Sequence, residues 1–113
     1  MAVPPPPVVS EEQAIRAVLR AYVDAYSGLD PRVVKRLYPT VNEQALGQRF
    51  SEMRSQQVQI QGERIEITGT TASVTCTWAT NFVPKVGGPQ RGTARVTLRL
   101  QKAGDTWIIV DRR

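Results

Sequence analysis

The spacing of apolar residues changes near residue 57 of this chain, and that change constrains the fold more than any other feature. Before it, apolar side chains recur every three or four positions, which is the period of one face of an α-helix. From Gln57 they recur at every second position, which is the period of one face of a β-strand. Helices followed by consecutive strands predict an α+β domain, in which the helices pack on one face of an antiparallel sheet.

The first helix is expected to begin at Ser10-Glu11-Glu12-Gln13, which forms a capping box. Gly28 is the natural place for it to end, because glycine commonly follows the last helical turn. The apolar positions of this helix form a single stripe, made of Ile15, Val18, Leu19, Tyr22 and Tyr26. The stripe predicts which side of the helix faces the core.

Two shorter helices are expected to follow the first. One begins at Asp30-Pro31, with the aspartate as N-cap and the proline in the first helical position, and it ends at Pro39. The other extends from Thr40, which can form a second capping box with Glu43, to about Arg54.

Strands are expected throughout the second half of the chain. The first, over 57–67, changes the parity of its apolar positions at Gly62-Glu63, which indicates a bulge or bend. The second, over 72–82, and the third, over 94–101, alternate cleanly, so that one sheet face meets the helices and the other meets water or a partner. The last, over 107–110, is a continuous apolar run and is therefore expected to be an interior strand buried on both faces.

The composition excludes several classes of function. The chain has no histidine and a single cysteine, Cys76, so it lacks the imidazole of triads and zinc sites and cannot form an internal disulfide. We therefore expect no metal site and no cofactor. The net charge of +5 attracts anions in general, but the basic residues form no run, and nucleic acid is not expected as a partner. No apolar segment approaches the length of about 20 residues that a membrane span requires.

The first nine residues contain four consecutive prolines, Pro4 to Pro7. Proline lacks an amide donor and favours an extended polyproline II spacer, which usually joins domains. We therefore expect residues 1–9 to be a linker and residues 10–113 to be one domain that follows another domain of the same protein. The alternative is a ragged terminus with no linking role.

The stretch from Ile15 to Tyr38, IRAVLRAYVDAYSGLDPRVVKRLY, and the order of elements after it resemble the NTF2-like superfamily, which includes SnoaL-like and ketosteroid-isomerase-like proteins. The segments YVDAYSGLD, LYPTV, RFSEMRSQQ and FVPKVGG resemble, more narrowly, a C-terminal NTF2-like domain of multidomain bacterial proteins such as Ser/Thr protein kinases. The resemblance covers nearly all of residues 11–111. It implies a cone of three N-terminal helices on a curved four-stranded antiparallel sheet.

The catalytic residues of the superfamily are not carried over to this chain. The isomerase branch of that family has a carboxylate base on a strand just after the second helix, where this sequence reads Pro39-Thr40-Val41-Asn42. The dehydratase branch relies on histidine, which is absent here. The resemblance therefore implies a fold and a setting, and it does not imply a reaction.

In the fold that the resemblance implies, a pocket would lie between the helices and the concave sheet face. Aromatic side chains with a polar end suit a small amphipathic ligand. The residues that we expect to line this pocket are Tyr22, Asp24, Tyr26, Tyr38, Trp78 and Phe82. The alternative is that the aromatic residues are ordinary core, as stripes at helical spacing usually are, and that Asp24 is exposed, because it lies one position off the stripe.

The outward side of the third strand carries a polar row, made of Arg95, Thr97, Arg99 and Gln101. This row is a candidate face for an anionic partner or for a homodimer, and the alternative is a face covered only by water.

Three functions are compatible with the sequence. The first is a non-catalytic accessory module that binds a small ligand or a partner, or dimerises, for an upstream domain such as a protein kinase. The second is a small pocket enzyme of the isomerase, cyclase or dehydratase type, in which Asp24 and the tyrosines perform acid-base chemistry. The third is a protein-interaction domain that uses the basic sheet face. The sequence leaves the compartment open.

Overall fold

The computed structural model describes residues 11–113 and contains helices and strands in the expected order. The helices are α1 (Glu11–Ser27), α2 (Pro31–Leu37) and α3 (Glu43–Ser51), and the strands are β1 (Met53–Thr68), β2 (Thr71–Pro84), β3 (Gln90–Ala103) and β4 (Thr106–Arg112). The prediction of an α+β domain is confirmed. The expected linker, and Ser10 at the start of the first capping box, lie outside the described residues.

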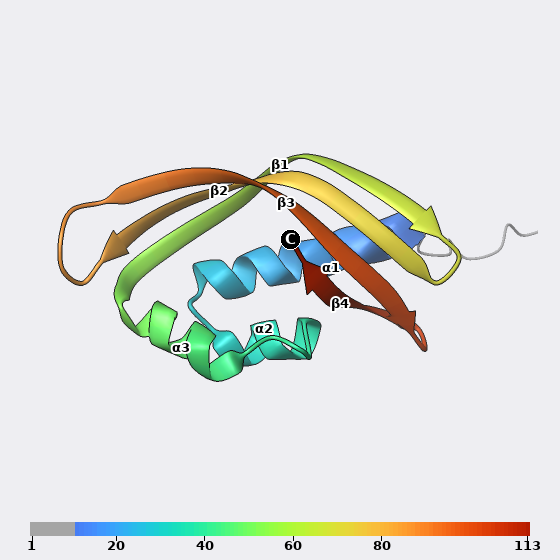
Figure 1. Cartoon of the computed structure of the whole chain (residues 1–113), viewed down its shortest axis with the longest axis horizontal. Helices are drawn as coiled ribbons and strands as arrows, with labels where there is room; N and C mark the ends of the chain where they lie inside the picture. The colour runs from blue at the N-terminus through green and yellow to red at the C-terminus, as the bar shows by residue number, and fades with distance from the viewer. Residues whose placement is uncertain (1–10) are drawn as a thin grey trace, which may run out of the picture.

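The strands form one antiparallel sheet in the order β1-β2-β3-β4, and the sheet arches over the helices (Figure 1). Helix α1 runs beneath the arch, and in the same view α3 lies below the left half of the arch and α2 below its middle. The register between β1 and β2 shifts between Gln61 and Arg64, which confirms the bend expected at Gly62-Glu63. Gly62 has a φ of +60°, a conformation that glycine adopts without strain.

Strand β4 lies at the edge of the sheet, so the expectation of an interior strand buried on both faces is wrong. Its burial alternates, because Trp107 and Ile109 are buried whereas Val110 is exposed. The apolar run was ambiguous because Ile108 and Val110 occupy outward positions, and single apolar residues are common on protein surfaces.

The core lies between α1 and the concave face of the sheet. On α1 the residues Ile15, Leu19 and Tyr22 are buried, as the stripe predicts. The sheet meets them with the inward residues of its strands, among them Val74, Cys76, Trp78, Val96, Leu98, Leu100 and Ile109. Full burial of one large apolar side chain contributes about 1.5–3 kcal/mol, so this shared face holds the arch on the helix.

The ends of the short helices follow their capping residues. The Asp30 carboxylate accepts hydrogen bonds from the amides of Arg32 at 3.1 Å and Val33 at 3.3 Å, which confirms the predicted cap of α2. The predicted box at Thr40 is wrong, because Asn42 caps α3 instead and accepts a hydrogen bond from the Ala45 amide at 3.0 Å.

Helix α3 stops at Ser51, earlier than expected, because strand β1 already begins at Met53. At the end of α1 the positive φ of 52° belongs to Leu29 and not to Gly28, although the helix ends at Ser27 as the glycine predicts. None of the helices in residues 11–113 has the length and apolar composition that crossing a membrane requires.

Candidate ligand-binding site

A hollow of about 630 Å³ lies between the helices and the concave side of the sheet. Five of the six residues predicted to line a pocket meet there, namely Tyr22, Tyr26, Tyr38, Trp78 and Phe82. The rest of the lining comes from the start of β1, the first half of β3 and residues 112–113, together with Val41, Arg49 of α3 and Thr80 of β2. Segments that are far apart in the sequence therefore build one site.

Asp24, the sixth predicted residue, lies outside this hollow. Its side chain is exposed and lines a separate depression between α1 and β1, together with Arg20 and Val23. Asp24 lies one position off the apolar stripe of α1, so the helix turns it away from the tyrosines. The structure thus separates the carboxylate from the aromatic residues with which the enzyme hypothesis combined it.

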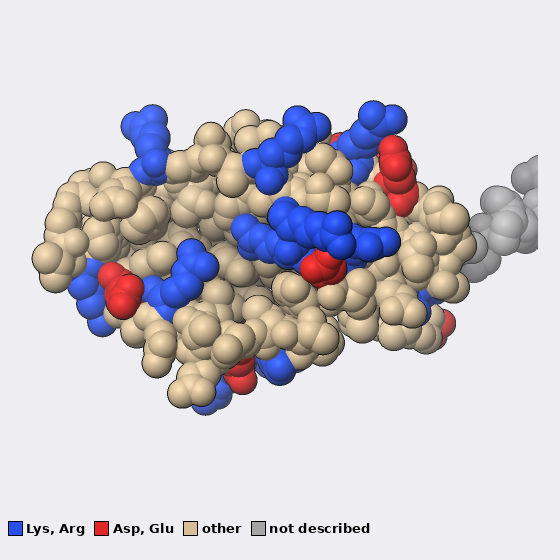
Figure 2. All heavy atoms as spheres, in the orientation of Figure 1, with Lys and Arg blue, Asp and Glu red and all other residues tan. Residues whose placement is uncertain are grey.

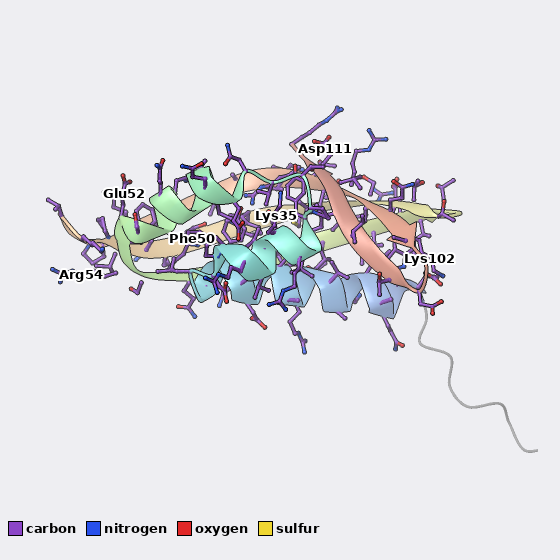
Figure 3. The ribbon with its side chains drawn as sticks, turned by 90° about the horizontal axis from the view of Figure 1, so that it is seen from below. Lys35, Phe50, Glu52, Arg54, Lys102 and Asp111 are labelled. Carbon is purple, nitrogen blue, oxygen red and sulfur yellow. The ribbon has the colours of Figure 1, made fainter. Side chains whose placement is uncertain are left out.

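The aromatic side chains form one packed wall. The ring centroids of Tyr22 and Tyr26 lie 5.0 Å apart, and each tyrosine also contacts Trp78, at 5.5 Å and 5.1 Å respectively. Phe50 of α3, which Figure 3 labels, meets Tyr26 edge to face at 5.4 Å. Such tilted pairs are a favourable arrangement for aromatic rings, so the wall is preformed. Tyr22 and Trp78 are buried within it, at 0% and 6% exposure, whereas Tyr26 is half-buried and presents ring surface and a hydroxyl group.

Arg112, at the end of β4, reaches this wall and was missed by the sequence analysis. Its Nη1 donates a hydrogen bond to the Tyr22 hydroxyl at 2.9 Å. Its Cζ lies 4.3 Å from the ring centroid of Trp78 and 5.5 Å from that of Tyr26, distances at which a cation and an aromatic face attract each other. The hollow therefore contains a half-buried positive charge.

A bulge in β4 explains why Arg112 points inward. Leu100 pairs with Ile109, whereas the preceding residue of β3, Arg99, pairs with Asp111, so Val110 is the extra residue. Simple alternation from the buried Ile109 would have turned Asp111 inward and Arg112 outward. The bulge reverses that parity and places Arg112 opposite the buried Leu98. The unbroken apolar run before it was the one sequence signal of irregular alternation.

The hydroxyl of Tyr22 connects Arg112 to the helix. It accepts the hydrogen bond from Arg112 and donates one to the Tyr26 hydroxyl at 3.4 Å. Burial raises the pKa of Tyr22 well above its ordinary value, and the neighbouring Arg112 guanidinium offsets only part of that rise. Tyr22 therefore stays protonated at neutral pH and supplies a neutral hydroxyl.

The lining residues do not include the usual acid-base groups within residues 11–113. Within residues 11–113, none of the side chains lining the hollow is an aspartate, a glutamate or a histidine, so the hollow lacks the usual general bases. In the same range no three carboxylate, thiol or imidazole groups gather where they would hold a metal ion. What the hollow offers is aromatic surface, hydroxyl groups and guanidinium cations.

Comparisons with known proteins give the fold. The sequence matches no protein-family model and no curated protein. An NTF2-like superfamily protein from Salmonella enterica superposes with a TM-score of 0.81 at 18% identity, over 90% of this chain and 87% of that chain. A Streptomyces avermitilis protein of the NTF2-like family, proposed to be a dehydratase, gives 0.80 at 13% identity, over 91% and 94%. This chain has the NTF2-like fold.

A third comparison is with a protein of a different description. A Xanthomonas campestris protein proposed to be a calcium/calmodulin dependent protein kinase II association domain superposes with a TM-score of 0.76 at 17% identity, over 92% of this chain and 86% of that chain. Identities this low establish the NTF2-like fold alone. Because the neighbours range from a proposed dehydratase to a proposed association domain, function has to be argued from the site.

The outer face of the NTF2-like sheet carries the polar row predicted from the sequence. Arg95, Arg99 and Gln101 are exposed, and Thr97 is half-buried. Across from this row lie other polar residues of β2, because Arg95 pairs with Thr77 and Arg99 with Ser73. Among residues 11–113, no ion pair involves Arg95 or Arg99, although Arg99 lies opposite Asp111 of β4 in the sheet register.

Proposed function

We propose that this NTF2-like domain is a non-catalytic accessory module that holds a small amphipathic ligand in its hollow for another domain of the same protein. The observation that carries the proposal is the composition of the hollow, which combines an aromatic wall with polar groups and, among residues 11–113, has none of the usual general bases. The proline-rich residues 1–9 support attachment to another domain. The enzyme hypothesis needed Asp24 as its acid-base group, and Asp24 lies outside the hollow.

The proposal is tested by filling the hollow. Thr80 lines it, so Thr80→Trp introduces a large side chain into the ligand space. Thr75→Trp is the matched control, because Thr75 lies on the same strand and its partner across β3 is the outward Thr97. In a thermal-shift screen of small aromatic and alicyclic compounds, we expect binders to raise the melting temperature of the wild type and of Thr75→Trp. They should fail to do so for Thr80→Trp.

The screen also has a direct optical readout, because Trp78 belongs to the wall of the hollow. Ligands that occupy the hollow should change its fluorescence, whereas the buried Trp107 lies outside the lining. A screen in which no compound changes either the melting temperature or the fluorescence would contradict the proposal, and so would binding that survives Thr80→Trp.

A second candidate function is association through the outer face. The observation that favours it is the exposure of Arg95 and Arg99 without carboxylate partners in residues 11–113. Two copies in contact through this row would bring like charges together, so an acidic partner fits better than a homodimer. A polyglutamate peptide should bind at low salt, and Arg95→Ser combined with Arg99→Ser should abolish binding. Arg32→Ser combined with Arg36→Ser, on α2, is the control.

A further inference from the structure

We propose that the ligand of the hollow is a small organic anion, a carboxylate carried on an aromatic or alicyclic ring, and that its carboxylate pairs with Arg112. This inference rests on the proposed function, since it names the chemical class that the hollow accepts. It is carried by three observations: an incompletely partnered cation, a wall suited to a ring, and an excess of positive charge around both.

The first observation is the environment of Arg112. A charge removed from water is normally paired with an opposite charge. Within residues 11–113 no carboxylate forms an ion pair with Arg112, and its one hydrogen-bond partner is the neutral hydroxyl of Tyr22. A guanidinium group has five N–H donors, so most of them are left for a ligand. The raised pKa of Tyr22 means that no tyrosinate neutralises the cation.

The second observation is the shape of the partner that this arrangement fits. Guanidinium is planar and binds a carboxylate through two parallel hydrogen bonds. The face of the Arg112 guanidinium is occupied by Trp78, so its donors meet a ligand at the edge. Tyr38 and Phe82 also line the hollow, are only partly buried, and supply apolar surface for the remainder of the ligand. The volume of about 630 Å³ is ample for a single ring.

The third observation is the charge of the lining as a whole. Besides Arg112, the residues Arg49, Arg91 and Arg113 line the hollow, and no lining residue within 11–113 is acidic. One of these cations is compensated, because Arg113 pairs with the neighbouring Asp111 at 3.0 Å. Figure 2 shows basic side chains gathered over the end of β4, with one acidic group beside them. A concave surface with this charge attracts anions and raises their rate of association.

A ring carboxylate is favoured over a phosphate or a sulfate. A dianion would require several buried donors, whereas the hollow has one half-buried guanidinium, and its other arginines Arg49, Arg91 and Arg113 are exposed to water. The aromatic wall also contributes nothing to a bare inorganic anion, whereas it stabilises a ring by contact and burial. Ring and charge are therefore recognised together.

The test uses benzoate and cyclohexanecarboxylate as anionic probes, benzamide as the neutral probe of the same shape, and inorganic phosphate as the anion without a ring. Affinities for the chain are measured by calorimetry at low salt. Because a hydrogen bond to a charged group is worth more than one to a neutral group, we expect benzoate to bind at least about tenfold more tightly than benzamide. Arg112→Met should reduce this ratio to about one.

Arg36→Met is the matched control for the loss of one positive charge, because Arg36 is exposed on α2 and does not line the hollow. It should leave the benzoate-to-benzamide ratio unchanged. If Arg112→Met does not fold, the wild type still decides the matter by NMR. The side-chain Nε–H signal of Arg112 should shift when benzoate is added and should stay in place when benzamide is added.

The outcomes separate this inference from the proposed function. Equal affinity for benzoate and benzamide would overturn the carboxylate assignment, because the hollow would then bind a ring without selecting for its charge. Phosphate binding as tightly as benzoate would also overturn it, because the site would then select charge without a ring. If neither the probes nor any compound of the wider screen binds, the proposed ligand-binding function is refuted.

Discussion

At the scale of single residues, the hydroxyl of Tyr22 is the group that makes the position of Arg112 possible. Among residues 11–113, it is the hydrogen-bond acceptor of the half-buried guanidinium. Tyr22→Phe removes that acceptor and leaves the cation with aromatic faces alone. We expect the free energy of unfolding to fall by about 1.5–3 kcal/mol, since a hydrogen bond to a charged group contributes in this range. Urea denaturation at neutral pH measures the change.

Tyr38→Phe provides the control for that substitution. Tyr38 also lines the hollow, but in residues 11–113 its hydroxyl makes no hydrogen bond. Its replacement should change stability by less than about 0.5 kcal/mol, as is usual away from buried polar contacts. Equal effects of the two substitutions would mean that the Tyr22–Arg112 contact contributes nothing specific.

The sequence predicted the aromatic part of the site and missed its charged part, for a physical reason. Tyr22 and Tyr26 lie on an uninterrupted helical stripe, and Trp78 on a regularly alternating strand, so periodicity alone places them. Arg112 follows a bulge, and one extra residue reverses every side chain after it. Asp24 shows the converse, because regular helical geometry already indicated that it points away from the stripe.

At the scale of secondary-structure elements, the bulge in β4 leads to a prediction about chain length. Val110 is the extra residue of the bulge, so deleting it lets the remaining residues alternate with Ile109 and Arg112 still inward. Deleting Ile108 instead would turn either Trp107 or Ile109 away from the core. We expect the second deletion to cost at least about 3 kcal/mol, comparable with removing a large core side chain, and the first to cost clearly less. Thermal unfolding of both variants decides.

The sequence did not predict which residue caps α3 or where β4 lies in the sheet, because both depend on contacts with neighbouring segments. Asn42 caps α3 in place of Thr40, because Thr40 lies within a turn in which the Val41 amide donates to the Tyr38 carbonyl. Strand β4 could not be assigned to an edge or an interior position from its composition, because that distinction depends on which strands lie beside it. The type and order of the elements were predictable, since they follow from the spacing of apolar residues along the sequence.

Glu11 joins the first turn of α1 to the β3–β4 hairpin. Its carboxylate accepts hydrogen bonds from Lys102 Nζ at 2.6 Å and from Trp107 Nε1 at 2.7 Å, and Figure 3 shows Lys102 beside the start of α1. The bond from Lys102, followed by that from Trp107, lowers the pKa of Glu11 below its ordinary value of 4.5. The ionised form is therefore favoured in the folded state.

The pH dependence follows from the sign of that shift. The unfolded chain takes up the proton at a higher pH than the folded chain does. The contribution of Glu11 to the free energy of unfolding is therefore fully present above pH 4.5, and it is lost as the pH falls through the lower pKa of the folded state. Glu11→Gln should therefore be less stable than the wild type at neutral pH, and the difference should shrink in acid. Urea denaturation at several pH values measures it. Glu52→Gln is the control for the loss of one carboxylate, because the exposed side chain of Glu52 forms no ion pair within residues 11–113. An equal loss of stability at neutral pH in both variants would refute the contact.

At the scale of the whole molecule, the hollow is the place where the helices and the far end of the sheet meet without filling the space between them. Tyr22 and Tyr26 come from α1 and Arg112 comes from the last strand, so a ligand held by both would connect the two ends of the chain. A ligand that binds only the folded state stabilises it by mass action, by about 2.7 kcal/mol at a hundredfold excess over Kd. Benzoate at that excess should raise the melting temperature accordingly.

Hydrogen exchange shows where that stabilisation acts. Amides near Tyr26 and at the end of β4 should exchange more slowly with benzoate bound, because local opening of either segment would break contacts to the ligand. The β1–β2 turn around Gly69 lies outside the hollow, and its exposed amides should exchange at unchanged rates. Exchange that slows at the turn but not at β4 would place the benzoate elsewhere. Exchange that slows in α1 alone would leave Arg112 without a part in binding.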